Sequence, residues 1–128
     1  MLAFDKLKKE QLKDWLSSAY YIHDSVIESN EYECKTKSLS VVVTNDYFHT
    51  KIRFQFKNIV SLFINNRNEC GNPGQIIAGT LEDNHSLFAE KFGLCRNKIE
   101  EYLYFTFQMF SMDELHILCE QIVIETIR

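Results

Sequence analysis

The spacing of apolar residues changes abruptly at residues 20–27, Tyr-Tyr-Ile-His-Asp-Ser-Val-Ile, and this change limits the possible folds more than any other feature. Before it, apolar residues recur every three to five positions, as on one face of a helix: Phe4, Leu7, Leu12, Trp15, Leu16 and Ala19. This spacing predicts a helix over residues 4–20. A helix of that length is not stable alone, so the face that carries Trp15 must lie against the rest of the chain.

After the junction, apolar and polar residues alternate in short segments, as in strands with one buried face. The expected strands are 25–34, 38–44, 51–57, 59–64, 75–83, 88–92, 99–110 and 115–127. The segments 38–44 and 51–57 form a hairpin with one apolar and one polar face. The alternation slips at Asn58, which predicts a bulge or bend there, followed by a strand covered on both faces. Residues 65–74 are rich in Asn and Gly and predict a loop.

The last segment, residues 113–127, suits either a strand or a helix. Its β-branched run Ile122-Val123-Ile124 favours a strand, in which Leu115, Ile117, Cys119, Val123 and Ile127 would share one face.

The predicted fold is α+β and mostly β: an N-terminal helix packed on a mainly antiparallel, twisted sheet or half-open barrel of about six to eight strands. The chain has 128 residues, of which 45% are apolar and 13% aromatic, and this is enough for one domain with its own core. We expect a single domain over 1–128, with the helical region at 1–22 and the β-rich body at 23–128.

The N-terminus carries three lysines and no apolar run, so we expect neither a signal peptide nor a membrane span, and a cytoplasmic location. The four cysteines form no C-x-x-C pair, which argues against a zinc site and for free thiols. No phosphate loop, nucleophile elbow or dinucleotide-binding glycine motif occurs. We expect no cofactor, no metal and no enzymatic activity.

His23, Asp24 and Ser25 are polar residues at the junction, and we expect a structural corner. Asp24 or Ser25 can accept hydrogen bonds from backbone N–H groups where the chain turns. A small enzyme that uses His23 and Asp24 remains an alternative. The four histidines are far apart in the sequence and are expected at the surface.

Charge is unevenly distributed along the chain. Residues 35–67 contain six Lys or Arg and a single acid, Asp46. Lys51, Arg53 and Lys57 share one strand face that carries no aromatic residue, and RNA-binding sheets place aromatics on such a face for stacking. Nucleic-acid binding is therefore not expected.

Carboxylates could instead bind a basic protein, because complementary charge speeds association and selects the partner. The candidate partner-binding residues are Glu28, Glu31, Glu33, Glu82, Asp83, Glu100 and Glu101.

Several short motifs together resemble a group of small bacterial immunity proteins. They are Trp15 in the N-terminal helix, His23-Asp24-Ser25 before the first strand, the segments 39–43 and 52–56, and the pattern of residues 114–125. Many proteins of this group neutralise toxins of polymorphic or contact-dependent growth-inhibition systems. The resemblance implies a non-catalytic antidote that binds a cognate toxin domain, a nuclease in the main hypothesis, and covers its active site. A homodimeric β-rich interaction module is a second alternative, and the binding face and oligomeric state stay open.

Overall fold

The computed structural model describes residues 1–19, 22–65, 76–82, 101–109 and 113–127. In chain order its elements are β1 (Leu2–Phe4), a 3-10 turn (Lys6–Lys8), α1 (Lys9–Ser18), β2 (Val26–Glu33), β3 (Ser38–Asn45), β4 (Thr50–Asn65), β5 (Ile76–Leu81), β6 (Leu103–Met109) and β7 (Glu114–Thr126). The strands of this described part form one antiparallel sheet in the order β2-β3-β4-β7-β6-β5, and β1 pairs with β7. The predicted α+β, mostly β fold is confirmed, and residues 114–126 are a strand.

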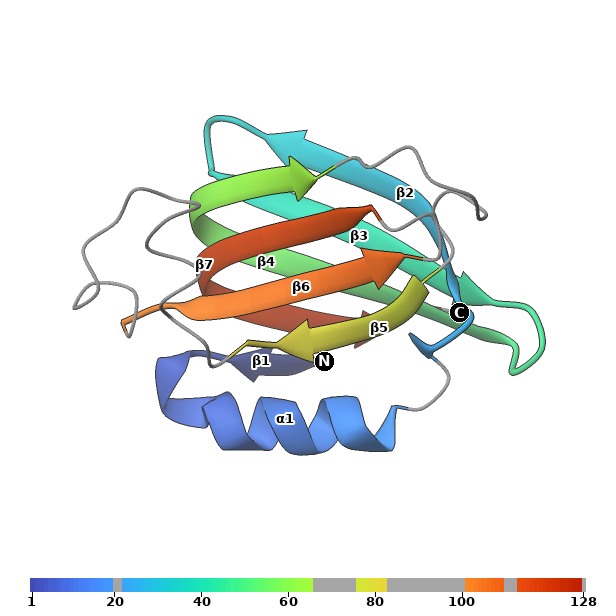
Figure 1. Cartoon of the computed structure of the whole chain (residues 1–128). Coiled ribbons are helices and arrows are strands. Elements are labelled where there is room, and N and C mark those ends of the chain that lie inside the picture. The colour runs from blue at the N-terminus through green and yellow to red at the C-terminus, as the bar shows by residue number, and fades with distance from the viewer. Residues whose placement is uncertain (20–21, 66–75, 83–100, 110–112, 128) are drawn as a thin grey trace.

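The two long strands, β4 and β7, belong to two layers at once (Figure 1). In the first layer, the first half of β4 pairs with residues 121–126 of β7, and this layer also holds β3, β2 and β1. In the second layer, the second half of β4 pairs with residues 114–119 of β7, and β6 and β5 continue the sheet. The sheet therefore folds over on itself, and strands that bend from one layer into the other form the corner.

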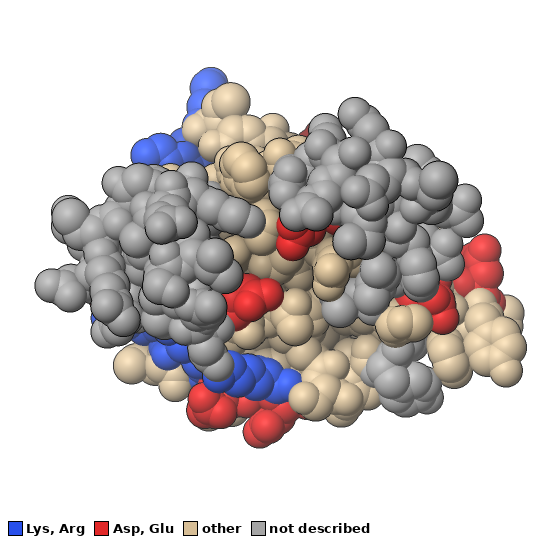
Figure 2. All heavy atoms as spheres, in the orientation of Figure 1, with Lys and Arg blue, Asp and Glu red and all other residues tan. Residues whose placement is uncertain are grey.

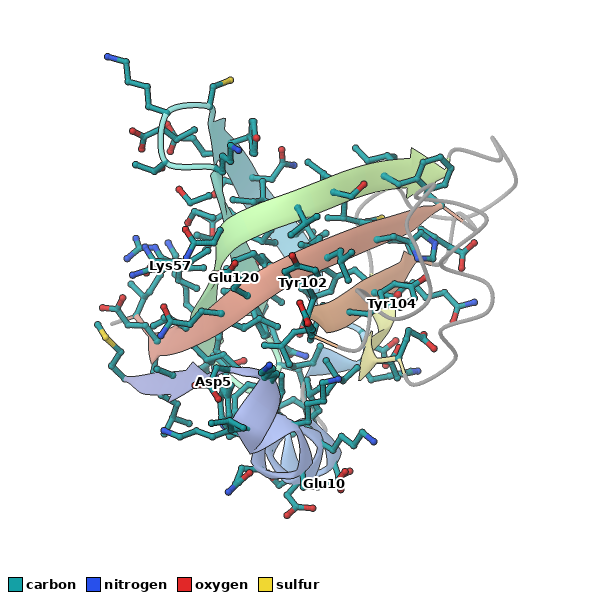
Figure 3. The ribbon with its side chains drawn as sticks, turned by 90° about the vertical axis from the view of Figure 1, so that its left-hand side faces the viewer. Asp5, Glu10, Lys57, Tyr102, Tyr104 and Glu120 are labelled. Carbon is teal, nitrogen blue, oxygen red and sulfur yellow. The ribbon has the colours of Figure 1, made fainter. Side chains whose placement is uncertain are left out.

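Both long strands change face at the corner. Phe56 and Ile59 of β4 both point into the core, although they are three residues apart and strict alternation would place them on opposite faces. Cys119 and Ile122, which pair with them on β7, do the same. Asn58 lies between, with a left-handed φ of 53°, and its Nδ2 donates a hydrogen bond of 3.3 Å to Glu120 Oε2. The predicted bend at Asn58 is confirmed, and Figure 3 shows both strands bending near Lys57 and Glu120.

The change of face in β7 corrects one sequence prediction. Val123 was expected on the same face as Cys119, but Ile122 and Ile124 occupy the core face instead. Val123 pairs with Gln55 on the outer side of the first layer. The prediction was wrong because it assumed that the alternation continues without a break beyond Glu120.

Aromatic rings fill the space between the layers. Phe54 and Phe56 of β4 meet Phe105 and Phe107 of β6, and all four are fully buried. The ring centroids of Phe54 and Phe107 are 5.4 Å apart, and those of Phe56 and Phe105 are 5.3 Å apart. Aromatic pairs at such separations stabilise a core beyond the area that they bury.

Helix α1 covers one open side of the folded sheet, next to β1 and β5 (Figure 1). Its Leu12 is fully buried, and the Trp15 ring meets Phe54 edge-on with centroids 6.1 Å apart. The α-helix is shorter than the predicted 4–20, because Phe4 is buried in strand β1 and Asp5 ends that strand by accepting a hydrogen bond of 2.9 Å from Leu7 N.

The segment 59–64 was expected to be covered on both faces, and this was wrong. Ile59 is buried, but Val60, Leu62, Phe63 and Ile64 are between 36% and 58% exposed. The expected strand at 88–92 and most of the expected loop at 65–74 lie outside the described residues; Asn65 itself ends β4.

We expect Asn58→Val to lower the free energy of unfolding by about 1–2 kcal/mol, because a β-branched side chain is strained in the left-handed conformation of this residue. Asn58→Gly should lose less, since glycine adopts that conformation freely. Urea unfolding of the two variants and the wild type measures the difference. Equal losses for Val and Gly would show that the side-chain bond to Glu120, rather than the backbone conformation, holds the corner.

Candidate functional site

Ser25 of the His-Asp-Ser junction is a structural residue. It is 1% exposed, its backbone N–H donates to the Ile22 carbonyl at 3.1 Å, and its Oγ accepts a hydrogen bond of 3.3 Å from Asn45 Nδ2. The Oδ1 of the same Asn45, which is also buried, accepts from Phe48 N at 3.1 Å. These bonds join the start of β2 to the turn between β3 and β4.

His23 and Asp24 point to solvent beside this junction. Their side chains are more than half exposed, and His23 Nδ1 lies 3.1 Å from Asp24 Oδ2. Asp24 has a left-handed φ of 67°, which Asp adopts more readily than most residues. An open hollow of about 590 Å³ extends from the pair to Tyr47 and Phe48. Catalysis by such a pair needs a further reactive group beside it. Ser25, the next residue in the sequence, does not supply that group, because it is buried and bonded to Asn45.

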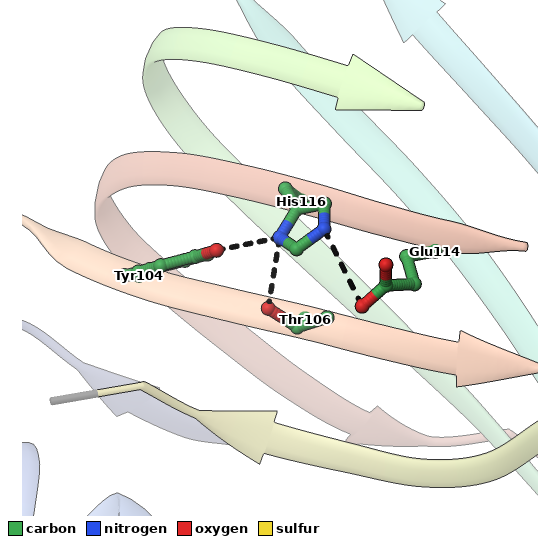
Figure 4. Close-up of polar contacts among 4 residues, drawn as sticks. All are labelled: Tyr104, Thr106, Glu114 and His116. Atoms are coloured by element: carbon green, nitrogen blue, oxygen red, sulfur yellow. Dashed lines mark hydrogen bonds and ion pairs between the residues drawn. The ribbon is translucent and has the colours of Figure 1, made fainter. Parts of the chain in front are cut away.

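A second polar cluster lies on the outer face of the second layer, and the sequence analysis missed it (Figure 4). Tyr104 Oη lies 2.6 Å from His116 Nδ1, and Thr106 Oγ1 lies 3.3 Å from the same nitrogen. On the other side of the ring, His116 Nε2 is 3.8 Å from Glu114 Oε2. His116, expected at the surface, is only 4% exposed.

The burial of this cluster determines its chemistry. Burial raises the pKa of Tyr104 to about 12, and its protonated hydroxyl can donate a hydrogen bond to His116 Nδ1. The proton of a neutral His116 then sits on Nε2, toward the Glu114 carboxylate. Tyr104 and Thr106 of β6 both lie within hydrogen-bond distance of His116 Nδ1 on β7, whereas His116 Nε2 and the Glu114 carboxylate, 3.8 Å apart, are beyond that distance. The cluster therefore links the two strands mainly through Nδ1.

The sequence held a weak signal for this cluster. Tyr104 and Thr106 alternate on β6, and Glu114 and His116 alternate on β7, so each pair shares one face of its strand. Only the pairing register, which sets Thr106 opposite His116, brings the two pairs together. That register is a long-range property that no local pattern reveals.

The structure separates the predicted partner-binding carboxylates. Glu28, Glu31 and Glu33 lie together on β2, and all three are exposed. Glu82 follows β5 at the other end of the sheet order, where its N–H donates to the Tyr104 carbonyl at 2.8 Å. Glu101 is exposed and precedes β6. Asp83 and Glu100 lie outside the described residues.

The basic strand face of β4 is flanked by acids on both sides. Lys51 Nζ lies 3.4 Å from Glu28 Oε1 of β2, and Arg53 lies 3.4 Å from Glu125 of β7. Lys57 lines a shallow hollow that also contains Glu31 and Glu33. On the face seen in Figure 2, too, the coloured acidic and basic side chains are dispersed rather than gathered in one patch of a single sign.

No protein-family model matches the chain. No curated protein matches it either.

Within the described residues, no three His, Cys, Asp or Glu side chains gather closely enough to hold a metal ion. The helical segments of the same residues lack the length and hydropathy of a bilayer-crossing helix.

The bonds between Ser25, Asn45 and Phe48 predict a difference between buried and exposed residues at this junction. Asn45→Ala should lower the free energy of unfolding by about 1–3 kcal/mol, because it removes the buried bonds to Ser25 and to Phe48 N. His23→Ala and Asp46→Ala, which change exposed residues at the same junction, should each stay within about 0.5 kcal/mol of the wild type. Chemical denaturation compares them. A loss for His23→Ala as large as that for Asn45→Ala would contradict the structural role given to Ser25 and Asn45.

The raised pKa of Tyr104, about 12 against an ordinary 10, gives a pH prediction. The folded protein holds the phenolic proton more tightly than the unfolded chain, so this stabilisation is complete below pH 10 and is lost as the pH rises toward 12. Ultraviolet titration of tyrosinate should show a step near pH 12 that Tyr104→Phe removes. If the variant kept that step, the assignment to Tyr104 would be wrong.

Proposed function

We propose that this chain is a non-catalytic immunity-type protein that acts in the cytoplasm. It would neutralise a basic toxin domain, most concretely a nuclease, by binding over the active site of that domain. The observation that carries the proposal is the edge strand β2 with its three carboxylates. Two features of β2 support a role in binding: its open edge and its charge.

The edge of β2 is available for pairing with another chain. β2 pairs with β3 on one side, and within the described part of the chain it has no strand on the other side. Seven of its eight residues are exposed, and Ile27 is half-buried. An exposed strand edge offers backbone N–H and C=O groups to an added strand, which is a recurrent mode of peptide recognition.

The charge of β2 selects the partner. If two copies of β2 paired antiparallel around the middle of the strand, glutamates would lie opposite or next to one another, for example Glu28 opposite Glu33 or Glu31 opposite Glu31. Like charges directly opposite destabilise a strand pair. A segment with lysines or arginines avoids this cost and gains from complementary charge, so β2 favours a basic partner over a second copy of itself.

Binding over an active site needs no reactive group on this chain. A stable protein interface buries about 800 Å² on each partner, and complementary charge mainly raises the rate and selectivity of association. Nucleases carry basic residues where they contact phosphates, so an acidic strand laid across such a site would compete with nucleic acid for the same cations.

The test is a charge reversal on β2 with a matched control. Glu31→Lys/Glu33→Lys should weaken binding to the cognate toxin domain, to be sought first among the neighbouring genes, by roughly 2–5 kcal/mol, because it places like charges at the contact. Glu10→Lys/Asp14→Lys changes the net charge equally at exposed positions of α1, away from β2, and should bind like the wild type. Calorimetry gives the affinity, and protection of toxin-producing cells gives the activity.

Equal effects of the two double variants would show that net charge, and not β2, matters. A wild-type chain that neither binds nor protects would overturn the proposal. Sedimentation at several concentrations separates the homodimeric alternative: a dimer that is stable in the wild type would contradict the repulsion argued for β2.

A further inference from the structure

An apolar groove of about 300 Å³ opens between the two layers on the side away from α1. Its lining includes Ile27 and Tyr32 of β2, Leu39 of β3, Leu62 and Ile64 of β4 and Leu115 of β7, together with Asn30, Met109 and Asp113. In Figure 1 this side lies at the top, between β2 and the end of β4. α1 covers the opposite side.

The apolar walls of the groove are partly exposed. Leu62 and Ile64 pair with Ile117 and Leu115 of β7, so they face inward like those core residues. They are nevertheless 36% and 58% exposed, and Tyr32 across the groove is 46% exposed. Exposed apolar residues that cluster in this way mark interaction sites more often than single exposed residues do.

The groove and the carboxylates lie on opposite faces of the same strand. Asn30 and Tyr32 point toward the groove, whereas Glu31 and Glu33 alternate with them and line the hollow on the outer face. A strand added to the edge of β2 continues the sheet, so its side chains also alternate between these two faces. One set would lie over the groove and the other beside the glutamates.

We propose that the groove receives the apolar side chains of an extended partner segment in which apolar and basic residues alternate. This inference rests on the proposed binding function of β2 and specifies the sequence pattern of the segment that β2 recognises. The backbone bonds to β2 supply affinity for any extended chain, the groove selects aliphatic side chains at every second position, and the glutamates select Lys or Arg between them.

The charge of β2 favours this occupant over a second copy of the chain. A second β2 would bring glutamates to the outer face of the added strand, where Glu31 and Glu33 already lie. A purely apolar segment would gain nothing from those carboxylates. The alternating segment matches both faces at once.

The experiment uses the whole chain and two labelled peptides. One alternates Lys with Ile and the other alternates Lys with Thr, so the peptides have equal length and charge and both contain β-branched residues. We expect the Lys–Ile peptide to bind at least about tenfold more tightly by fluorescence anisotropy, equivalent to about 1.4 kcal/mol. Leu62→Asp, which puts a carboxylate into the groove, should remove this preference.

Phe63→Asp is the matched control, because Phe63 is on the same strand and 37% exposed but faces away from the groove, next to His116. It should keep the preference for Lys–Ile. Thermal melting of both variants confirms that each is folded at the temperature of the binding measurement. Ile64→Asp provides a second groove variant should Leu62→Asp unfold.

Each outcome decides the inference. Equal affinity for the two peptides in the wild type overturns the groove as a specificity site while leaving the acidic edge, and with it the proposed function, in place. Binding of neither peptide also overturns it, and the toxin experiment above then judges the proposed function separately. Self-association that Leu62→Asp abolishes would identify a second copy as the occupant and overturn the alternating segment.

Discussion

The paired strands β4 and β7 both switch the face that they turn to the core, at Asn58 and around Glu120. The positions of the other elements depend on this switch. Because core residues lie on both sides of the corner, the two halves of the sheet face each other across Phe54, Phe56, Phe105 and Phe107. A flat sheet of the same strands would have to bury one face against something else. Here the sheet supplies both walls of its core, and one short helix is enough to cover one side.

A sheet folded in this way has two open sides, and the chain treats them differently. On one side, α1 brings Leu12 and Trp15 against the core beside β1 and β5. On the other side, β2 and the end of β4 leave a groove with aliphatic walls. Within the described part of the chain, the fold that makes a small core possible therefore also leaves a partly exposed apolar groove next to an unpaired strand edge. The binding proposed above would use both without any change in the core.

Local patterns in the sequence predicted what local physics determines. The alternation of residues 38–44 and 51–57, the slip at Asn58 and the β-branched run at 122–124 each gave a correct element, because side-chain period and backbone propensity act over a few residues. The misses concern properties fixed by distant partners. Strand β1 exists because β7 offers it an edge, and the burial of His116 follows from the register that sets it opposite Thr106. The exposure of Leu62 and Ile64 depends on what the fold leaves open.

The same distinction between local and long-range properties applies to the candidate site. The sequence identified Glu28, Glu31 and Glu33 as carboxylates that could meet a basic partner, but their common position on an edge strand is a result of topology. An edge strand beside an apolar groove is a hazard, since it can pair with another copy and aggregate. Glutamates on the edge oppose that pairing, because each new copy would bring the same charges to the same place. A basic strand is exempt from the repulsion. The same three carboxylates can thus keep the free protein apart from its copies and still admit a partner of opposite charge, and the immunity function proposed above would need that combination.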